Sequence, residues 1–222
     1  YLKITFTDGD SRYAARKTAE RIVISALTAL VANVNDPPGG SLTITGTAEE
    51  DSTLTIENQI TDLDGITNGA FDYQWNTRVS VDGADTPITG EDGASLLLKQ
   101  AQVGKYITVT ASYTDDLDTA QSVTSAPTAK VENVNDEPGG SLTITGTAVE
   151  DGVLTAVNSI TDEDGTTKAT AGDDGYAFAF QWKADDSNIS GATGTTLTLG
   201  QAQVGKVITV TVTYKDDYNT DQ

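Results

Sequence analysis

The sequence contains no cysteine and no histidine. These absences exclude disulfide bonds, thiol nucleophiles, imidazole bases and the usual zinc ligands. The common nucleophile–base sets of hydrolytic enzymes cannot be built without these side chains, and we therefore expect that the chain is not an enzyme. The lack of cysteine does not exclude secretion, because a domain of about 100 residues buries enough surface to fold without disulfides.

Basic residues are scarce. Thirteen Lys and Arg stand against 33 Asp and Glu, and the formal net charge is -20. This charge repels a phosphate backbone and an anionic lipid surface, so we expect neither nucleic-acid binding nor direct membrane insertion. The partner that the charge favours is a divalent cation, because hard cations bind carboxylate and carbonyl oxygens. The alternative interpretation is that the acidity only keeps an extracellular protein soluble.

Long apolar runs are also missing. No run approaches the roughly 20 residues that span a bilayer. The chain has no signal peptide and opens at Tyr1 in what is expected to be the middle of a strand. We interpret it as a segment of a longer protein whose targeting signals lie elsewhere.

An internal repeat sets the domain organisation. The most faithful match joins "NVNDPPGGSLTITGTAEED" from Asn33 to "NVNDEPGGSLTITGTAVED" from Asn133, and "QAQVGK" occurs at Gln100 and Gln201. "SALTALVANVND" from Ser25 also matches "SAPTAKVENVND" from Ser125. The repeats predict three parts: 1–36 is the end of a preceding repeat, 37–136 is a complete repeat, and 137–222 is a repeat without its last strand.

Apolar residues alternate with Thr in both of the longer repeats, as in "YITVTAS" from Tyr106 and "VITVTVT" from Val207. This period of two, bounded by Gly, Asp and Asn, is the signal for β-strands. A helical turn is expected only within residues 13–24. About seven short strands per hundred residues predict an all-β fold of antiparallel β-sandwiches joined head to tail. Trp75 and Trp182, each on a third strand, are expected in the cores, although a tryptophan can also stack on a sugar.

The acidic and amide residues should gather where consecutive repeats join. In a sandwich, loops alternate between its two ends, so the loop after the first strand (about 41–48) lies beside the linker that leads to the next repeat. The loop after the second strand of that next repeat faces the same joint. The residues expected at one joint are Glu50, Asp51, Asn133, Asn135, Asp136, Asp162 and Asp164. Those expected at the preceding joint are Asn33, Asn35, Asp36, Asp62 and Asp64. Such oxygen-rich clusters suit Ca²⁺, which takes 6–8 oxygen ligands, whereas each Asp-x-Asp-Gly alone is also an ordinary turn.

These motifs resemble the cadherin-like calcium motif, in which an acidic linker, an upstream Glu and a downstream Asp-x-Asp hold ions between domains. The whole repeat resembles the tandem Ig-like/cadherin-like repeats of giant bacterial surface adhesins, including RTX-type adhesins. The sequence departs from the cadherin pattern at Asn33 and Asn133, which occupy the place of an Asp, and at Pro37 and Glu137 after the linker. The resemblance implies an extracellular, cell-surface protein for adhesion and biofilm formation.

Three functions are consistent with this sequence. The first is a structural spacer, stiffened by calcium between neighbouring repeats, that holds a distal ligand-binding domain away from the cell. The second is a recognition module that binds a glycan or a protein through the unequal loops 76–87 and 166–175, of which the first contains Arg78. The third is a subunit of a surface layer or filament in which a neighbour supplies the missing strand.

Overall fold

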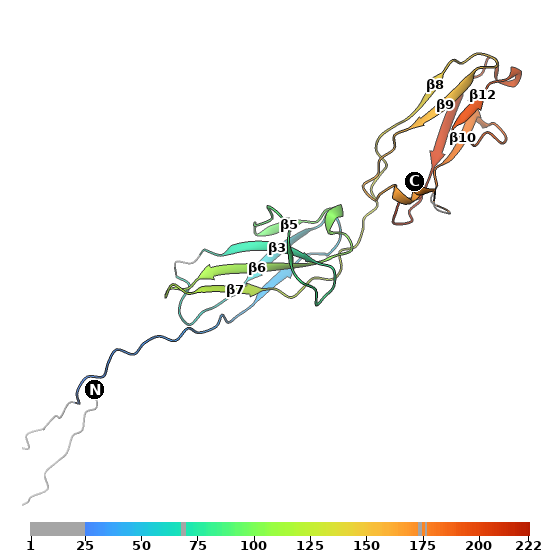
Figure 1. Ribbon diagram of the computed structural model, residues 1–222. Helices are drawn as coiled ribbons and strands as arrows, with labels where there is room; N and C mark the ends of the chain where they lie inside the picture. The colour runs from blue at the N-terminus through green and yellow to red at the C-terminus, as the bar shows by residue number, and fades with distance from the viewer. Residues whose placement is uncertain (1–24, 68–69, 173–174, 176) are drawn as a thin grey trace, which may run out of the picture. The chain divides into compact units, whose positions relative to one another are not determined.

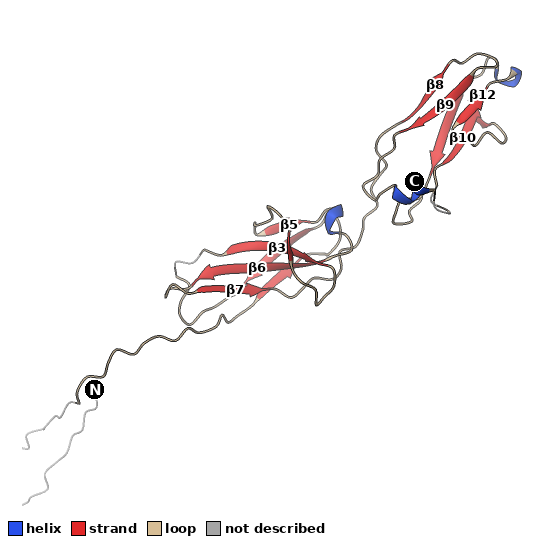
Figure 2. Cartoon of the chain, in the orientation of Figure 1, coloured by secondary structure: helices blue, strands red, loops and turns tan. Residues whose placement is uncertain are grey.

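The computed structural model describes residues 25–67, 70–172, 175 and 177–222. The helical turn expected within residues 13–24 lies outside the described part of the chain. The chain divides after Pro37, and the unit Pro38–Gln222 contains both sandwiches. Strands dominate this unit, and Figure 2 shows that helix is confined to short segments.

The first repeat folds into two antiparallel sheets that share one core. Its strands are β1 (Leu42–Thr45), β2 (Thr53–Asn58), β3 (Asp72–Arg78), β4 (Thr86–Pro87), β5 (Ser95–Leu97), β6 (Tyr106–Thr114) and β7 (Ala120–Thr124). One sheet has the order β1-β2-β5 and the other β4-β3-β6-β7. Figure 1 shows β3, β6 and β7 side by side in the second of these sheets.

Among the described residues, the second repeat follows the same plan with six strands. Its strands are β8 (Leu142–Gly146), β9 (Val153–Asn158), β10 (Ala179–Ala184), β11 (Ser187–Asn188), β12 (Thr196–Thr198) and β13 (Ile208–Thr213). The sheets have the orders β8-β9-β12 and β11-β10-β13, and every paired strand is antiparallel. The predicted all-β sandwich fold is therefore confirmed for the described residues.

Both tryptophans lie in the cores, as predicted. Trp75 on β3 and Trp182 on β10 are fully buried, and each indole nitrogen donates a hydrogen bond to a backbone carbonyl, of Gly93 and Gly194 respectively. The alternating apolar residues of β6 turn the same way, so that Ile107 packs with Trp75 in the core of the first repeat. Period-two alternation buries one face of a strand and exposes the other, so Ser112 and Thr114 lie on the exposed face of β6. Thr108 is an exception, because it is fully buried and its hydroxyl donates to Asp85 Oδ1.

Two elements differ from the prediction in detail. The first strand ends at Thr45 and not near residue 48. The next residue, Gly46, has a positive φ of 118°, and a side chain there would collide with the Thr53 carbonyl. The loop 166–175 contains a short helix, α1 (Thr167–Ala171), which Gly172 ends in the left-handed conformation. Only glycine adopts these backbone angles without strain.

Candidate metal centre

The loop after β1 places Glu50 beside the linker. The Glu50 amide donates to the Glu132 carbonyl at 2.9 Å, and the Glu132 amide donates to the Ala48 carbonyl at 3.0 Å. Asp51 makes the sharp turn with a left-handed φ of 61°. The Val134 amide then donates to Glu50 Oε2 at 3.3 Å. Glu50 is only 4% exposed, so a carboxylate is held inside the protein next to the linker backbone.

Asp164 enters the same place from the second repeat. It belongs to the turn after β9, in which the Asp164 amide donates to Asp162 Oδ1 at 3.0 Å and the Gly165 amide to the Asp162 carbonyl at 3.1 Å. Gly165 has a φ of 92°, and a side chain at this position would collide with the Asp217 carboxylate. The turn therefore uses the first Asp and the Gly of the Asp-x-Asp-Gly sequence, and it leaves the Asp164 carboxylate beside the linker.

The linker supplies the third carboxylate. The Asp136 amide donates to Asp164 Oδ2 at 2.7 Å, which ties the linker to the second repeat. Oxygens of Glu50, Asp136 and Asp164 all lie within 4.8 Å of one another. Three carboxylates from three separate segments thus converge at a spacing that suits one cation.

One of these oxygens has no hydrogen-bond partner. Asp164 is 1% exposed, and its Oδ1 atom is buried without any donor within hydrogen-bond distance. A buried carboxylate oxygen without a partner is unfavourable by about 1–3 kcal/mol or more, because it has lost its contact with water. A metal ion bound to the three carboxylates would satisfy this atom, so the residues fit a cation.

The electrostatics of the cluster agree with this fit. Burial raises the pKa of Glu50 above its ordinary value, and the charges of Asp136, Asp164 and Asp51 raise it further. Burial and the charge of Asp164 likewise raise the pKa of Asp136. Carboxylates that repel one another at close range hold protons more tightly, and a divalent cation removes that repulsion.

Gln100, which begins the short 3-10 helix Gln100–Gln102, also contacts the cluster and was not predicted from the sequence. Its side-chain amide lies 2.7 and 2.9 Å from the two carboxylate oxygens of Glu50, and it donates to both when its nitrogen faces them. With the amide turned the other way, its nitrogen donates to Asn133 Oδ1 at 3.4 Å. The signal in the sequence is the "QAQVGK" motif, which is identical in the two repeats.

The other residues predicted at this joint lie around the cluster in supporting positions. Asp162 uses both carboxylate oxygens within its own repeat, because Oδ1 accepts from Asp164 and Oδ2 accepts from the Tyr214 hydroxyl. Asn135 Oδ1 accepts a hydrogen bond from the side-chain amide of Gln222 at 2.7 Å. Asp51 is exposed, and Asn133 donates to the Val134 carbonyl at 3.3 Å. These residues position or surround the three central carboxylates.

The residues predicted for the preceding joint fall on both sides of the division after Pro37. Asn33, Asn35 and Asp36 lie before it and Asp62 and Asp64 after it, so their grouping stays a prediction. Within the first repeat, the turn is the same as in the second. The Asp64 amide donates to Asp62 Oδ1 at 2.9 Å, and the Tyr113 hydroxyl donates to Asp62 Oδ2 at 2.6 Å.

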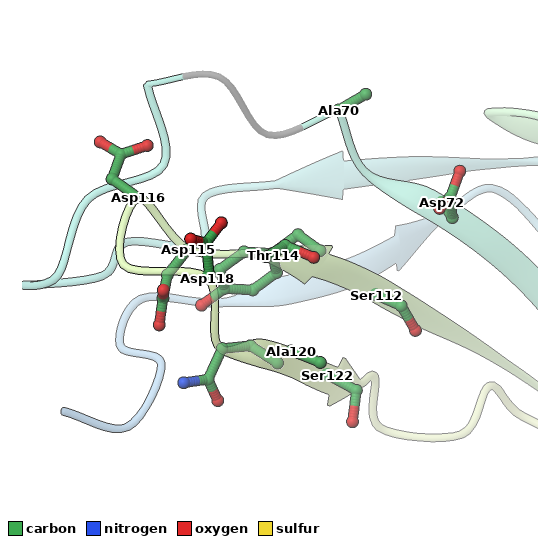
Figure 3. Close-up of a pocket in the computed structure, with 11 residues that line it drawn as sticks. Ala70, Asp72, Ser112, Thr114, Asp115, Asp116, Asp118, Ala120 and Ser122 are labelled. Carbon is green, nitrogen blue, oxygen red and sulfur yellow. The ribbon is translucent and has the colours of Figure 1, made fainter. Parts of the chain in front are cut away.

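A second acidic region lies at the end of β6 in the first repeat. A depression of about 700 Å³ is lined by the four acidic residues Asp72, Asp115, Asp116 and Asp118. Figure 3 shows Asp72 apart from Asp115 and Asp118. The Asp115 carboxylate accepts from the Leu117 and Thr119 amides at 2.9 and 2.8 Å, which lowers its pKa and shapes the loop. Within the described residues, the only metal-compatible convergence of three acidic side chains is that of Glu50, Asp136 and Asp164.

Within the described residues, no helix has the length and apolar character that a membrane crossing requires. Comparison with known proteins adds no identification: no protein-family model matches the chain, and no curated protein matches it.

Proposed function

We propose that the chain is a calcium-stiffened spacer from a large bacterial cell-surface or secreted adhesin. In this role, an ion at the joint between repeats limits their bending and so keeps a distal ligand-binding domain away from the cell. The observation that carries the proposal is the convergence of Glu50, Asp136 and Asp164 from the first repeat, the linker and the second repeat. The buried, unpartnered Oδ1 atom of Asp164 supports a cation there.

The choice of calcium follows from the ligands. All three central side chains are carboxylates, and the surrounding donors are amide and backbone oxygens, which are hard ligands. Calcium accepts 6–8 oxygens in flexible geometry, whereas magnesium demands a near-ideal octahedron. Extracellular modules bind calcium at about 10⁻⁴–10⁻³ M, which matches a site that is assembled from separate segments. The ion would be held by Glu50, Asp136 and Asp164, with the Gln100 amide orienting the Glu50 carboxylate.

The mechanical effect follows from where these ligands originate. Without an ion, the two repeats are joined by a short linker and a few hydrogen bonds, such as that from the Asp136 amide to Asp164. Interfaces of this kind normally permit relative motion. An ion bound at once to Glu50 of one repeat and Asp164 of the next adds bonds that break when the repeats bend. Calcium therefore converts a flexible joint into a stiff one.

The alternative function, a recognition module, is less favoured because Arg78, the main candidate for ligand binding, already pairs with Asp85. Arg78, the basic residue of the loop 76–87, is paired within that loop, with its Nε atom 2.6 Å from Asp85 Oδ1 and Nη2 3.0 Å from Asp85 Oδ2. Asp85 also accepts from the buried Thr108 hydroxyl at 2.6 Å. The guanidinium holds the loop on the sheet, and a ligand would have to compete with that pair.

A thermal melt tests the proposal. At a Kd of about 10⁻⁴ M, 10 mM calcium stabilises the folded form by roughly 2.7 kcal/mol, a shift of several degrees in Tm. We expect this shift with calcium, little with magnesium and none in excess EDTA. The Asp164→Asn variant should lose most of the shift. Asp92→Asn removes the same charge at an exposed loop position and should retain it. Equal melting temperatures in calcium and EDTA for the unsubstituted chain would refute the calcium site.

A further inference from the structure

One short motif of the second repeat takes no part in the candidate metal centre. Asn188, Ile189 and Ser190 form an Asn-x-Ser tripeptide, which is the pattern that N-linked glycosylation requires. No other Asn in the chain is followed two residues later by Ser or Thr. Because so short a pattern also occurs by chance, its meaning depends on how the fold presents these three residues.

Strand β11 directs the two polar side chains of the motif towards solvent. β11 pairs with β10, and Lys183 lies opposite Asn188. Ile189, the middle residue of the motif, packs against the core of the second repeat. Because successive side chains of an extended segment point to opposite faces, Asn188 and Ser190 point away from that core. Both residues are exposed, and neither side chain has a hydrogen-bond partner among the described residues.

The backbone of Asn188 faces the open side of β11. The Ile189 amide donates to the Trp182 carbonyl at 2.9 Å, so these two residues form a hydrogen-bonded pair of the antiparallel ladder. Hydrogen-bonded and non-hydrogen-bonded pairs alternate along such a ladder, and the next pair, Asn188 with Lys183, is therefore of the second kind. Asn188 can thus move towards an enzyme without breaking a ladder bond of its own.

The first repeat has a proline at this position. β4 pairs with β3 in the same register, with Pro87 opposite Asn76. The Ile88 amide donates to the Trp75 carbonyl at 2.9 Å, as at the equivalent place in the second repeat. β4 is the edge of a four-stranded sheet, and a proline there removes an N–H that could otherwise pair with another chain. The two repeats therefore differ at one edge position, at which only the first has a residue that blocks pairing.

We propose that Asn188 is a site of N-linked glycosylation and that its glycan covers the open edge of β11. The donor is a sugar activated as a phosphate ester of a lipid or nucleotide carrier, and a glycosyltransferase catalyses the transfer. A bond forms between Asn188 Nδ2 and the anomeric carbon, while the bond from that carbon to the phosphate oxygen breaks. The phosphate leaves with the bonding electrons, and one Nδ2 proton passes to a base of the transferase. The transferase also recognises the exposed Ser190 hydroxyl, which the pattern requires.

A glycan at Asn188 has a physical role at the sheet edge. N-linked glycans are bulky and solubilising, and they fit surface positions. At Asn188 the sugar would stand beside backbone groups that can otherwise pair with the sheet edge of a second chain. The first repeat needs no sugar at this place, because Pro87 has no N–H to offer. This role is separate from the calcium-stiffened joint, since Asn188 and Ser190 are not among the ligands of the metal centre.

Mass spectrometry of the full chain, secreted from a eukaryotic host that attaches N-linked glycans, tests the site. We expect a mass above the 23.2 kDa of the bare chain, and peptide-N-glycosidase in heavy-oxygen water should convert Asn188 to a labelled aspartate. Ser190→Ala removes the required hydroxyl and should abolish the modification, whereas Ser190→Thr keeps the pattern and should retain it. An unmodified Asn188 in the unsubstituted chain, or a glycan that persists in Ser190→Ala, would overturn the site.

Sedimentation velocity over a dilution series tests the role at the edge. All samples contain EDTA, so the outcome does not depend on calcium. Asn188→Gln has no glycan and should associate about tenfold more strongly than the glycosylated chain. Asn188→Pro also has no glycan, but it installs the residue of the first repeat and should associate as weakly as the glycosylated chain. Equal association of the three proteins would overturn the edge-covering role, while the mass measurement decides the site itself.

Discussion

The two repeats use nearly the same sequence for one strand and bury it to different depths. Ile107, Val109 and Ala111 on β6 are fully buried, whereas Ile208, Val210 and Val212 on β13 are only half-buried. The alternation of apolar residues is the same in both, so it cannot cause the difference. The first repeat has β7 and Val131 beside the strand, and the second repeat has no counterpart among the described residues. The burial of β6 therefore depends on the segments packed beside it and not on its own alternation alone.

Among the substitutions considered, removal of the Trp75 side chain should change the relative stability of the two repeats most. Trp75→Ala empties the centre of the better-packed core and should destabilise the first repeat by about 3–5 kcal/mol. Scanning calorimetry should then show the first repeat melting before the second. Trp182→Ala is the matched control and should lower only the transition of the second repeat. If the first repeat of the Trp75→Ala protein melted at an unchanged temperature, the assignment of Trp75 to its core would be contradicted.

Val131 lies in the segment after β7 and is buried in the core of the first repeat. A substitution there measures what this segment contributes to the stability of the core. Val131→Ala removes two methyl groups from a buried site and should cost about 2 kcal/mol in the first repeat. Hydrogen-exchange mass spectrometry should show faster exchange in β6 and no change in β13. Val31→Ala makes the same substitution at an exposed counterpart and should leave the exchange of a dilute, monomeric sample unchanged in both strands. Equal effects of the two substitutions would show that Val131 does not close the core.

The smallest effect concerns the ion pair between Arg78 and Asp85 in the first repeat. Arg78 lowers the pKa of Asp85 below its ordinary value near 3.8. The stability from this pair is therefore present above that ordinary value and is lost as the pH falls through the lowered folded-state pKa. Asp85→Asn should slightly lower the urea midpoint of the first repeat at pH 7 and should match the unsubstituted chain at pH 2.5. A gap that persists in acid would assign the effect to the Thr108 contact.

Much of the fold could be predicted because its determinants are local. The period-two alternation of apolar residues predicted the strands. The repeated tryptophan predicted the position of the third strand and the burial of its side chain. The end of β1 at Thr45 could not be predicted, because the sequence pattern does not mark it: Gly46 follows β1, whereas its counterpart Gly146 is the last residue of β8. The short helix α1 was not predicted for a different reason, since it lies in a loop that is seven residues longer than its counterpart in the first repeat.

The candidate site was predicted in outline and less well in detail. Loop alternation in a sandwich is enough to bring Glu50, Asp136 and Asp164 to one joint. The same argument could not separate Asp164 from Asp162, because two residues of one turn face different neighbours: Asp162 meets Tyr214, and Asp164 meets the linker. Gln100 was missed because its role depends on packing beside Glu50 and not on charge.

The central claim is that calcium stiffens the joint between the repeats, and a distance measurement tests it most directly. The chain has no cysteine, so Glu57→Cys on β2 and Val157→Cys on β9 place two spin labels at matching exposed positions. Double electron–electron resonance should give a broad distance distribution in EDTA and a narrow one in calcium. Magnesium and the Asp164→Asn variant should leave the distribution broad. Equal widths in EDTA and calcium would contradict the account.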